Sequence, residues 1–427
     1  MSAHTIGAGG PLTGRVTLPG CKGISHRALL LAAVADGRST MRNLATGEDV
    51  ARTRAALEAM DIECIDGGDG GLTVVGRGFD MISEPDDPID CGNSGTTMRM
   101  LAGFLCGRPL EFDLVGDASL SRRPMDRVVE PLRRLGARIA TTDGHAPLHI
   151  TGGVLTGAEI DLPMASGQVK SAVLLAGLQA SGTTTVREPA PSRDHTERLL
   201  AALGAPITRL DDRTVRVGTI GALDRFDAEI PGDASSAAFL VVAAATVPGS
   251  EITIDGVNLN PTRIAYLDVL SAMGADITTT VLEERLGEPV GEITVRYTPL
   301  DATTITSSEG IVDELPILAV AAACATGDSP IEGAAELRVK ESDRIATTTS
   351  MLEAFGVAVR PTDDGFVVTG GARHGATVDS AGDHRIAMCA AVAGLTADGP
   401  TTVTGWEAVD VSFPGFAPTL ERLRSGA

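Results

Sequence analysis

The sequence contains little of what a metal site, a disulfide framework or a membrane span requires. Its 6 cysteines are scattered without a C-x-x-C pair, which is typical of proteins kept in a reducing cytoplasm. Its 7 histidines form no H-E-x-x-H motif and no His/Cys ligand spacing, so we expect no metal. The longest apolar runs, 238–247 and 315–325, are too short to cross a bilayer, and the N-terminus lacks a signal-peptide pattern. These absences predict a cytoplasmic protein without a membrane partner.

Positive charge is also scarce. The chain has 35 Lys and Arg against 56 Asp and Glu, a formal net charge of −21. Nucleic acids and acidic membranes are bound by extended basic faces, so we expect neither as a partner. A few cations focused in a cleft can still bind a small anion. With 427 residues, of which 43% are hydrophobic, the chain is long enough for two or three domains with cores of their own.

An apolar, alanine-rich segment recurs six times, and each copy runs into a glycine. These glycines are Gly37, Gly107, Gly182, Gly249, Gly327 and Gly399. A segment that is apolar on all sides and followed by glycine predicts a helix that is buried all round and stops at the glycine. Six copies indicate an internal repeat.

A second predicted helix follows each buried one. These helices end within 57–62, 132–137, 200–205, 270–275, 352–357 and 420–425. Five of them lead into pairs of alternating strands with Gly/Asp turns, whereas the sixth reaches the end of the chain. We expect its missing strand to be the N-terminal segment GRVTLPG (14–20), which would place both termini in one domain.

A polar motif stands ahead of each buried helix. The six motifs are CKGISHR (21–27), CGNSGT (91–96), ASGQVK (165–170), PGDASS (231–236), IVDELP (311–316) and GDHR (382–385). Helix N-termini bind anions, so six of them facing one cleft would form an anion-binding chamber. The first motif contains the cations Lys22 and Arg27, with the potentially basic His26 between them. We expect Lys22 and Arg27 to be ligands for a carboxylate or phosphate. A purely structural repeat array is the alternative.

Eight motifs carry a resemblance to a known family. They are PGCKGISHRALLLAA, GNSGTTMR, SLSRRPMDRV, MASGQVKSAVLLAG, SRDHTERLL, ELRVKESDRI, GDHRIAM and VSFPGF. In this order, between residues 11 and 418, they resemble the 5-enolpyruvylshikimate-3-phosphate synthase family. The resemblance implies an α/β fold of six helix-and-hairpin units, three per domain, each domain an inside-out α/β barrel. It divides the chain into 1–20 plus 230–427 and 21–229, with the active site in the cleft between the domains.

The resemblance also implies a reaction. The enolpyruvyl group of phosphoenolpyruvate passes to the 5-hydroxyl of shikimate 3-phosphate and phosphate is released, a step of the shikimate pathway to chorismate and the aromatic amino acids. It implies no cofactor, a monomer, and glyphosate as an inhibitor.

By motif match, shikimate 3-phosphate is expected at Lys22, Arg27, Ser166, Gln168, Arg193, Asp313 and Lys340. Phosphoenolpyruvate is expected at Lys22, Gly95, Arg123, Gln168, Arg344 and Arg385. The implied catalytic residues are Asp313, Glu341 and Lys22: Glu341 resembles the donor of a proton to the methylene carbon, and Asp313 resembles the residue that orients and deprotonates the acceptor hydroxyl. Asp313 is also a candidate helix N-cap. The division of acid and base among these three residues stays open.

Four positions depart from the family pattern. Gly23 replaces a serine that donates to the shikimate carboxylate, and Cys21 replaces a Ser or Asp. Gly167 offers only its backbone N–H to the phosphate. Many relatives have a lysine near the position of Val411, and this sequence lacks it, which leaves one fewer cation for phosphoenolpyruvate.

These departures keep other acceptors open. UDP-N-acetylglucosamine enolpyruvyl transferases usually carry a cysteine, or an aspartate in its place, on the loop before an R-P-x-D motif. Here the loop reads GDASLSRRPMD, which has no cysteine but has Asp117 before that motif. A transferase of specialised metabolism that acts on another phosphorylated alcohol is the other alternative.

Overall fold

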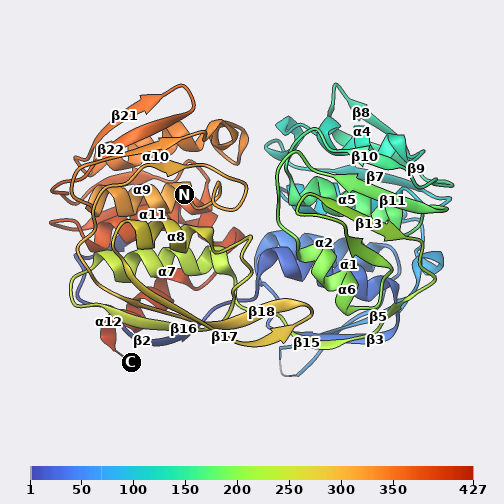
Figure 1. The fold of residues 1–427 in the computed structure, drawn as a ribbon, viewed down its shortest axis with the longest axis horizontal. Helices are drawn as coiled ribbons and strands as arrows, with labels where there is room; N and C mark the ends of the chain where they lie inside the picture. Colours follow the sequence, from blue (N-terminus) through green and yellow to red (C-terminus); the bar gives the residue numbers. More distant parts are fainter. Residues whose placement is uncertain (1, 69, 427) are drawn as a thin grey trace. The chain divides into compact units, whose positions relative to one another are not determined.

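The computed structural model describes residues 2–68 and 70–426 (Figure 1). The chain forms two compact units. Unit 1 comprises Met1–Pro19, Pro231–Glu283 and Pro289–Ala427, and unit 2 comprises Gly20–Ile230 and Glu284–Glu288. The sequence-based division placed its boundaries next to Gly20 and Ile230. It did not foresee that the short segment 284–288 packs with unit 2.

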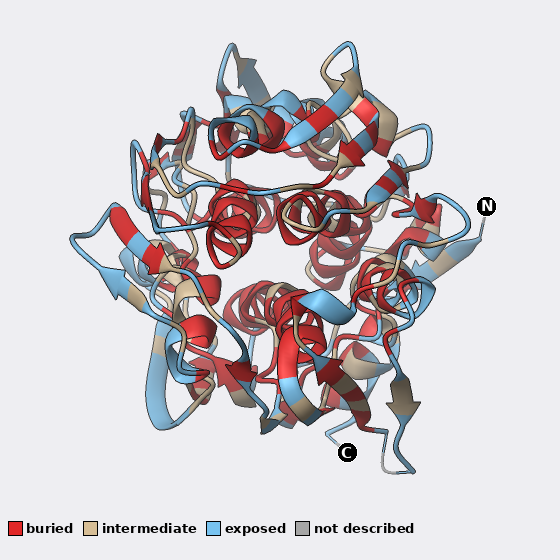
Figure 2. Cartoon of the chain, turned by 90° about the vertical axis from the view of Figure 1, so that its right-hand side faces the viewer, coloured by how far each residue is buried: buried red, intermediate tan, exposed pale blue. Residues whose placement is uncertain are grey.

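Three central helices form the core of each unit. They are α1 (Lys22–Val34), α3 (Gly95–Leu105) and α5 (Gly167–Gly177) in unit 2, and α7 (Ala234–Thr246), α9 (Leu315–Cys324) and α11 (His384–Leu395) in unit 1. Figure 2 shows the buried residues concentrated on these helices. Small side chains let them pack closely: a Cβ on Gly103 would lie 2.0 Å from the carbonyl oxygen of Ala172. The prediction of six buried helices is confirmed.

Gly37 and Gly327, two of the recurring glycines, do not stop their helices. α1 ends at Val34, and Gly37 lies within the following strand at φ +109°. α9 ends at Cys324, and Gly327 precedes the next strand at φ +107°. L-residues with a side chain rarely adopt this backbone conformation. The helix stops predicted at Gly37 and Gly327 therefore lie a few residues too late.

The second helix of each repeat packs on the outside and buries one stripe. These helices are α2 (Glu48–Ala59), α4 (Asp126–Arg134), α6 (His195–Ala202), α8 (Ala265–Ala272), α10 (Arg344–Ala354) and α12 (Phe416–Ser425). Their positions confirm the prediction. Four short 3-10 helices, among them η2 (Leu120–Arg122), η3 (Ala335–Val339) and η4 (Trp406–Val411), lie in the described connections. None of the described helices combines the length and the apolar character of a transmembrane span.

Unit 2 contains three sheets with the orders β14-β3-β5-β4, β6-β7-β9-β8 and β10-β11-β13-β12, and β15 also pairs with β3. In the first sheet the strands are β3 (Ala35–Arg42), β4 (Cys64–Asp66), β5 (Leu72–Arg77), β14 (Leu223–Asp224) and β15 (Asp227–Glu229). In the second they are β6 (Ile89–Asp90), β7 (Glu111–Val115), β8 (Arg138–Thr142) and β9 (His145–Thr151). In the third they are β10 (Glu159–Asp161), β11 (Thr183–Arg187), β12 (Ile207–Arg209) and β13 (Thr214–Gly218).

Unit 1 also contains three sheets, with the orders β17-β18-β16-β2, β19-β20-β22-β21 and β1-β24-β23. In the first sheet the strands are β2 (Thr13–Thr17), β16 (Glu251–Asn258), β17 (Asp276–Arg285) and β18 (Glu288–Arg296). In the second they are β19 (Ile305–Thr306), β20 (Asp328–Glu332), β21 (Ala358–Thr362) and β22 (Gly365–Thr369). In the third they are β1 (Ala3–Ile6), β23 (Thr377–Asp379) and β24 (Thr401–Thr404). Among the described residues the three sheets of a unit stay separate, so the expected barrel is not closed by hydrogen bonds.

The N-terminal segment lies in unit 1 with the C-terminal part of the chain, as expected, but strand pairing shows that GRVTLPG joins a different repeat from the one predicted. In four repeats the strand before a central helix pairs in parallel with the strand after it: β6 with β7, β10 with β11, β19 with β20 and β23 with β24. The other two repeats exchange these strands. β2 precedes α1 but pairs with β16 of the fourth repeat. β14 and β15 precede α7 but pair with β3 of the first repeat. The segment GRVTLPG thus serves the fourth repeat. The strand added to the sixth repeat is β1, antiparallel to β24.

Candidate active site

The N-termini of the three central helices of unit 1 meet through their side chains. Ser235 lies at the start of α7, Glu314 is the N-cap of α9, and Arg385 lies at the start of α11. The Ser235 hydroxyl donates to Oε1 of Glu314, and Nη1 and Nη2 of Arg385 lie 3.4 Å from that oxygen and 3.3 Å from the Ser235 hydroxyl. Three of the motifs singled out in the sequence therefore converge.

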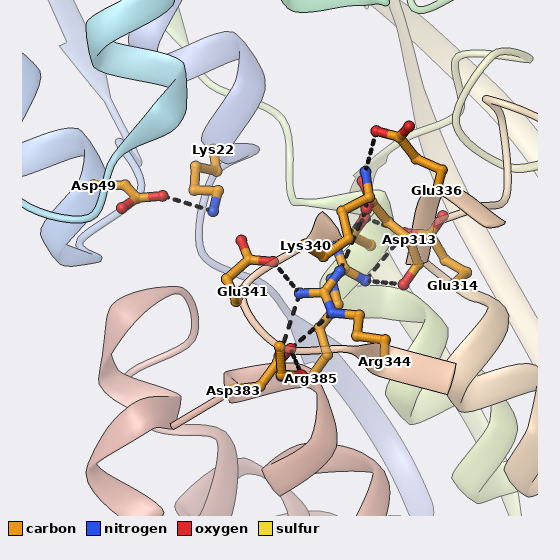
Figure 3. Close-up of polar contacts among 12 residues, drawn as sticks. Lys22, Asp49, Asp313, Glu314, Glu336, Lys340, Glu341, Arg344, Asp383 and Arg385 are labelled. Carbon is orange, nitrogen blue, oxygen red and sulfur yellow. Dashed lines mark hydrogen bonds and ion pairs between the residues drawn. The ribbon is translucent and has the colours of Figure 1, made fainter. Parts of the chain in front are cut away.

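Arg344 pairs with three carboxylates (Figure 3). Its Nη2 lies 2.6 Å from Oε2 of Glu341, its Nε lies 2.8 Å from Oδ2 of Asp383, and its Nη1 lies 3.5 Å from Oδ1 of Asp313. The side chain is 1% exposed. Burial acts to lower the pKa of Arg344, but Asp383, Glu341 and Asp313 outweigh it and raise the pKa above its usual value. Arg344 therefore stays charged and holds both proposed catalytic carboxylates.

Asp313 faces two cations rather than capping a helix. Nζ of Lys340 lies 3.4 Å from its Oδ1, the same oxygen that faces Arg344. α9 begins at Leu315 with Glu314 in the N-cap position, so the N-cap interpretation of Asp313 is wrong. Its carboxylate instead belongs to the charged cluster. Lys340 also lies 3.7 Å from Glu336.

Asp383 joins this cluster to α11 and was missed by the sequence analysis. Its Oδ1 accepts the backbone N–H of Arg385 at 2.9 Å, and both of its oxygens accept from Arg344. Burial alone would raise the pKa of this fully buried carboxyl, but the charges of Arg344 and His384 lower it below its usual value. The motif GDHR contained the signal, because Asp before a helix is a frequent N-cap.

In unit 2, Lys22 is the first residue of α1 and pairs with α2. Its Nζ lies 2.9 Å from Oδ2 of Asp49, and the Lys22 side chain is 28% exposed. Asp49 lies outside the motifs found in the sequence, and no sequence pattern marked it. Cys21 occupies the N-cap position without a side-chain cap bond.

Arg27 is buried, and its hydrogen-bond partners are neutral groups. Its Nε donates to the Thr196 hydroxyl at 2.7 Å, its Nη1 to the carbonyl of Gly23 at 2.7 Å, and its Nη2 to the carbonyl of Gly167 and the hydroxyl of Ser171. Burial lowers the pKa of Arg27 to about 10, so it remains charged at neutral pH. Much of its hydrogen-bonding capacity is used to join α1, α5 and α6.

His26 adds no positive charge at this helix start. The ring is 1% exposed, and burial lowers its pKa to about 3. Nδ1 lies 2.7 Å from the Thr53 hydroxyl, which contacts the Thr97 hydroxyl at 2.8 Å. The potentially basic His26 is therefore neutral, and it packs as a link between helices.

The start of α5 brings Ser166, Gln168 and Arg193 into one region. Ser166 caps the helix by accepting the backbone N–H of Val169. Oε1 of Gln168 accepts from Arg99 at 2.6 Å, and its amide donates to the Thr96 hydroxyl. A Cβ on Gly167 would lie 3.0 Å from the Cβ of Arg193. The absence of a side chain at position 167 therefore gives Arg193 its place.

The start of α3 combines a bare glycine with a guanidinium. A Cβ on Gly95 would lie 3.4 Å from Nη1 of Arg123. Nη2 of Arg123 donates to Oδ1 of Asn93 at 2.6 Å, and the amide of Asn93 donates to Asp117 at 3.0 Å. Asp117 also accepts the backbone N–H of Leu120 at 2.7 Å, so here it shapes the loop.

The expected site residues fall into two groups. Those of unit 2 are Lys22, Arg27, Gly95, Arg123, Ser166, Gln168 and Arg193. Those of unit 1 are Asp313, Lys340, Glu341, Arg344 and Arg385. Within each unit they lie at or beside the N-termini of the central helices, and several of them are cations. Such an arrangement suits small molecules with carboxylate and phosphate groups.

Comparison with known proteins identifies the family to which the chain is similar. The family model described as EPSP synthase (3-phosphoshikimate 1-carboxyvinyltransferase) matches residues 6–420. The chain is 48% identical to the 3-phosphoshikimate 1-carboxyvinyltransferase of Acidithiobacillus ferrooxidans, with 97% of this chain and 96% of that protein covered. It is also 48% identical to the protein of the same name from Roseiflexus castenholzii, with 99% of each covered.

Comparison with solved structures leads to the same family. The EPSP synthase of Acinetobacter baumannii matches with a TM-score of 0.88 and 39% identity, covering 99% of this chain and 98% of that one. The enolpyruvyl transferase NikO of Streptomyces tendae matches with a TM-score of 0.80 over 98% and 96% of the two chains, and at 21% identity it shows a shared fold alone. The resemblance carried by the eight motifs is confirmed, and the chain belongs to the EPSP synthase (3-phosphoshikimate 1-carboxyvinyltransferase) family.

Proposed function

We propose that this chain transfers the enolpyruvyl group of phosphoenolpyruvate to the 5-hydroxyl of shikimate 3-phosphate and releases phosphate. Family membership supports the reaction. The observation that carries its chemistry is that Asp313 and Glu341 both face the guanidinium of the buried Arg344, at 3.5 and 2.6 Å. Two carboxylates with different neighbours can divide the work of acid and base.

The balance of the reaction assigns a task to each carboxylate. A carbon–oxygen bond forms between the acceptor oxygen and the substituted carbon of phosphoenolpyruvate, so the hydroxyl loses a proton and the methylene carbon gains one. The product again carries a double bond, so the carbon then returns that proton while the bond to phosphate breaks. Glu341 suits the carbon-directed transfers, and Asp313, beside Lys340 at 3.4 Å, suits the hydroxyl. Lys22 remains a second candidate for proton transfer.

The charges of the substrates account for the remaining residues. The two substrates together carry two phosphates and two carboxylates, and arginine is the favoured partner of such groups because it binds them through two parallel N–H bonds. Arg123, Arg344 and Arg385 are proposed to hold phosphoenolpyruvate with Lys22, Gln168 and the backbone at Gly95. The acceptor is proposed to contact Arg27, Ser166, Gln168, Arg193 and Lys340, with Lys22 and Asp313. No cofactor takes part in this scheme.

An acceptor screen tests the proposal. The purified protein is given phosphoenolpyruvate with shikimate 3-phosphate, with UDP-N-acetylglucosamine, or with no acceptor, and phosphate release is followed together with product mass. We expect release with shikimate 3-phosphate alone. Release only with another alcohol would reassign the acceptor, and no release with any alcohol would overturn the transfer reaction.

A further inference from the structure

A buried charged cluster lies behind the proposed ligands of unit 1. It consists of Ser235, Arg263, Glu314 and Arg385, and we call it the Glu314 cluster. Glu314 is 0% exposed, and Arg263 and Ser235 are also buried. Taking a carboxylate and two guanidinium groups out of water is costly unless they pair well. No step of the proposed reaction uses Glu314 or Arg263, so their presence needs a separate reason.

Positive and negative groups alternate through the Glu314 cluster, from Arg263 through Glu314 to Arg385. Arg263 donates through Nη2 to the Ser235 hydroxyl and lies 3.5 Å from Oε1 of Glu314. The Ser235 hydroxyl in turn donates to that same oxygen. Arg385 closes the cluster on the other side, with Nη1 at 3.4 Å from Glu314 and Nη2 at 3.3 Å from Ser235. One carboxylate and one hydroxyl thus lie between two cations.

Two carboxylates that are neighbours in the sequence face different cations. Asp313 faces Lys340 and Arg344, whereas Glu314, the next residue, faces Arg263 and Arg385. Arg385 also donates through Nη1 to the backbone carbonyl of Asp313 at 2.7 Å. The turn that carries Asp313 therefore also fixes Arg385.

A count of the N–H donors of Arg385 shows which of them are not used by these contacts. A guanidinium has five N–H donors. The two at Nη1 are directed to Asp313 and Glu314, and one at Nη2 is directed to Ser235. Within the described part of the chain, Nε–H and the second Nη2–H have no protein acceptor. These two point along one edge of the plane, the geometry that binds a carboxylate or phosphate through two parallel bonds.

We propose that Glu314, acting with Ser235, is a positioning residue that holds one edge of Arg385 so that its other edge meets an oxyanion group of phosphoenolpyruvate. Arg263 supplies the balancing charge that allows Glu314 to be buried. The proposal rests on the proposed function, because it takes Arg385 as a ligand of the donor substrate.

Three atoms around the cluster have no hydrogen-bond partner among the described residues: Nη1 of Arg263, Oε2 of Glu314 and the Tyr266 hydroxyl. Burial raises the pKa of Tyr266 well above its usual value, so this hydroxyl stays neutral. Replacing Tyr266 by phenylalanine removes this hydroxyl, a polar atom close to Glu314 and Arg263, without breaking a contact to Arg385. Tyr266→Phe is therefore the matched control.

The test is steady-state kinetics of full-length variants with each substrate varied in turn. Glu314→Gln keeps the shape and an acceptor oxygen but removes the charge, and we expect its KM for phosphoenolpyruvate to rise about tenfold or more, since hydrogen bonds to a neutral amide hold Arg385 less strongly than bonds to a carboxylate. Its KM for shikimate 3-phosphate should stay near that of the wild type. General damage to the fold would raise both constants. Tyr266→Phe should leave both unchanged.

Two further variants separate positioning from folding. Ser235→Ala removes a single hydroxyl and should raise the KM for phosphoenolpyruvate in the same direction by a smaller factor. In the double variant Arg263→Met with Glu314→Gln the charges are balanced again, so the thermal midpoint should recover toward that of the wild type while the KM for phosphoenolpyruvate stays high.

The outcomes are distinct. A wild-type protein that does not transfer the enolpyruvyl group removes both the proposed function and this inference. An active wild type whose Glu314→Gln and Ser235→Ala variants keep the KM for phosphoenolpyruvate, or lose affinity for both substrates equally, removes this inference alone.

Discussion

Arg344 holds three carboxylates at once, and this determines what single substitutions in unit 1 can reveal. Because Glu341 lies 2.6 Å from Nη2 of Arg344, its glutamine variant can still accept that N–H bond through the amide oxygen. The amide cannot deliver a proton to carbon. We expect Glu341→Gln to keep both KM values and to lose about 10²–10⁴-fold in kcat. Phosphate release at saturating substrates measures this, and more than half of the wild-type kcat would remove Glu341 from the role.

Glu336→Gln is the control for this substitution. It removes a carboxylate of the same neighbourhood, 3.7 Å from Lys340, that has no proposed part in proton transfer. We expect it to retain most of the turnover. A loss equal to that of Glu341→Gln would show that the charge of the cluster, rather than one proton donor, limits the rate.

Gly23 can be tested by restoring a hydroxyl. The residue lies in α1, and a Cβ would be 3.5 Å from Cδ2 of His195 and 3.6 Å from Nη1 of Arg27, which are ordinary contacts. A hydrogen bond to a charged group contributes about 1.5–3 kcal/mol. We therefore expect Gly23→Ser to lower the KM for shikimate 3-phosphate several-fold, with no comparable change for phosphoenolpyruvate.

Gly23→Ala separates the hydroxyl from the added methyl group. It should leave the KM for shikimate 3-phosphate unchanged, and equal thermal midpoints for the three proteins should accompany these values. A stable serine variant whose KM does not fall would contradict a carboxylate contact at this end of α1.

At the scale of elements, a neutral histidine links α1 to α2. His26 has a folded-state pKa of about 3 against an ordinary value of 6.5, because it is buried. Below pH 6.5 the unfolded chain binds a proton that the folded protein refuses, so stability falls with pH from about 6.5 down to about 3. Each pH unit in this window costs about 1.4 kcal/mol. We expect His26→Gln to show a flatter loss of unfolding free energy between pH 7 and 5.

Chemical denaturation at several pH values measures that slope. His374→Gln, a change at an exposed histidine, is the control and should keep the wild-type slope. If His26→Gln lost stability with acid as steeply as the wild type, the histidine would not be the source of the pH dependence.

The first turn of α3 predicts how the protein responds to glyphosate. A methyl group on Gly95 would lie 3.3 Å from Nη1 of Arg99 and 3.4 Å from Nη1 of Arg123, so it would fill space beside a proposed phosphoenolpyruvate ligand. We propose that glyphosate binds there and reaches further than the substrate does. Gly95→Ala should then raise the inhibition constant for glyphosate by a larger factor than the KM for phosphoenolpyruvate. Equal inhibition constants for the two proteins would place the inhibitor elsewhere.

At the scale of the whole molecule, we propose that the protein is a monomer. Its net charge of −21 opposes self-association. The large hydrophobic residues exposed in the described part of the chain are Met81, Val154, Leu210, Val281, Leu282 and Val339, of which only Val281 and Leu282 are adjacent in the sequence. Light scattering at physiological salt should give the mass of one chain. A dimer would contradict this, and the edge strand β17, where Val281 and Leu282 are exposed, would be the first interface to test.

Much of this protein was determined by its sequence alone. The six buried helices followed from six recurring apolar segments, because a helix surrounded by other helices must be apolar on every face. Their six outer companions followed from the same repeat. The family and the residues that carry it followed from eight short motifs, which lie where helix N-termini offer N–H groups to anions. Both kinds of signal are local in the chain, and local signals survive in a sequence read without its fold.

The tertiary structure decided what depends on contacts between distant segments. The exchange of β2 with β14 and β15, the pairing of Asp49 with Lys22 and the neutral state of His26 each join residues from different elements. Glu314 looked like any residue at a helix start. Only packing of α7, α9 and α11 places its carboxylate between Arg263 and Arg385, because burial and the distance to a counter-charge are properties of the folded chain.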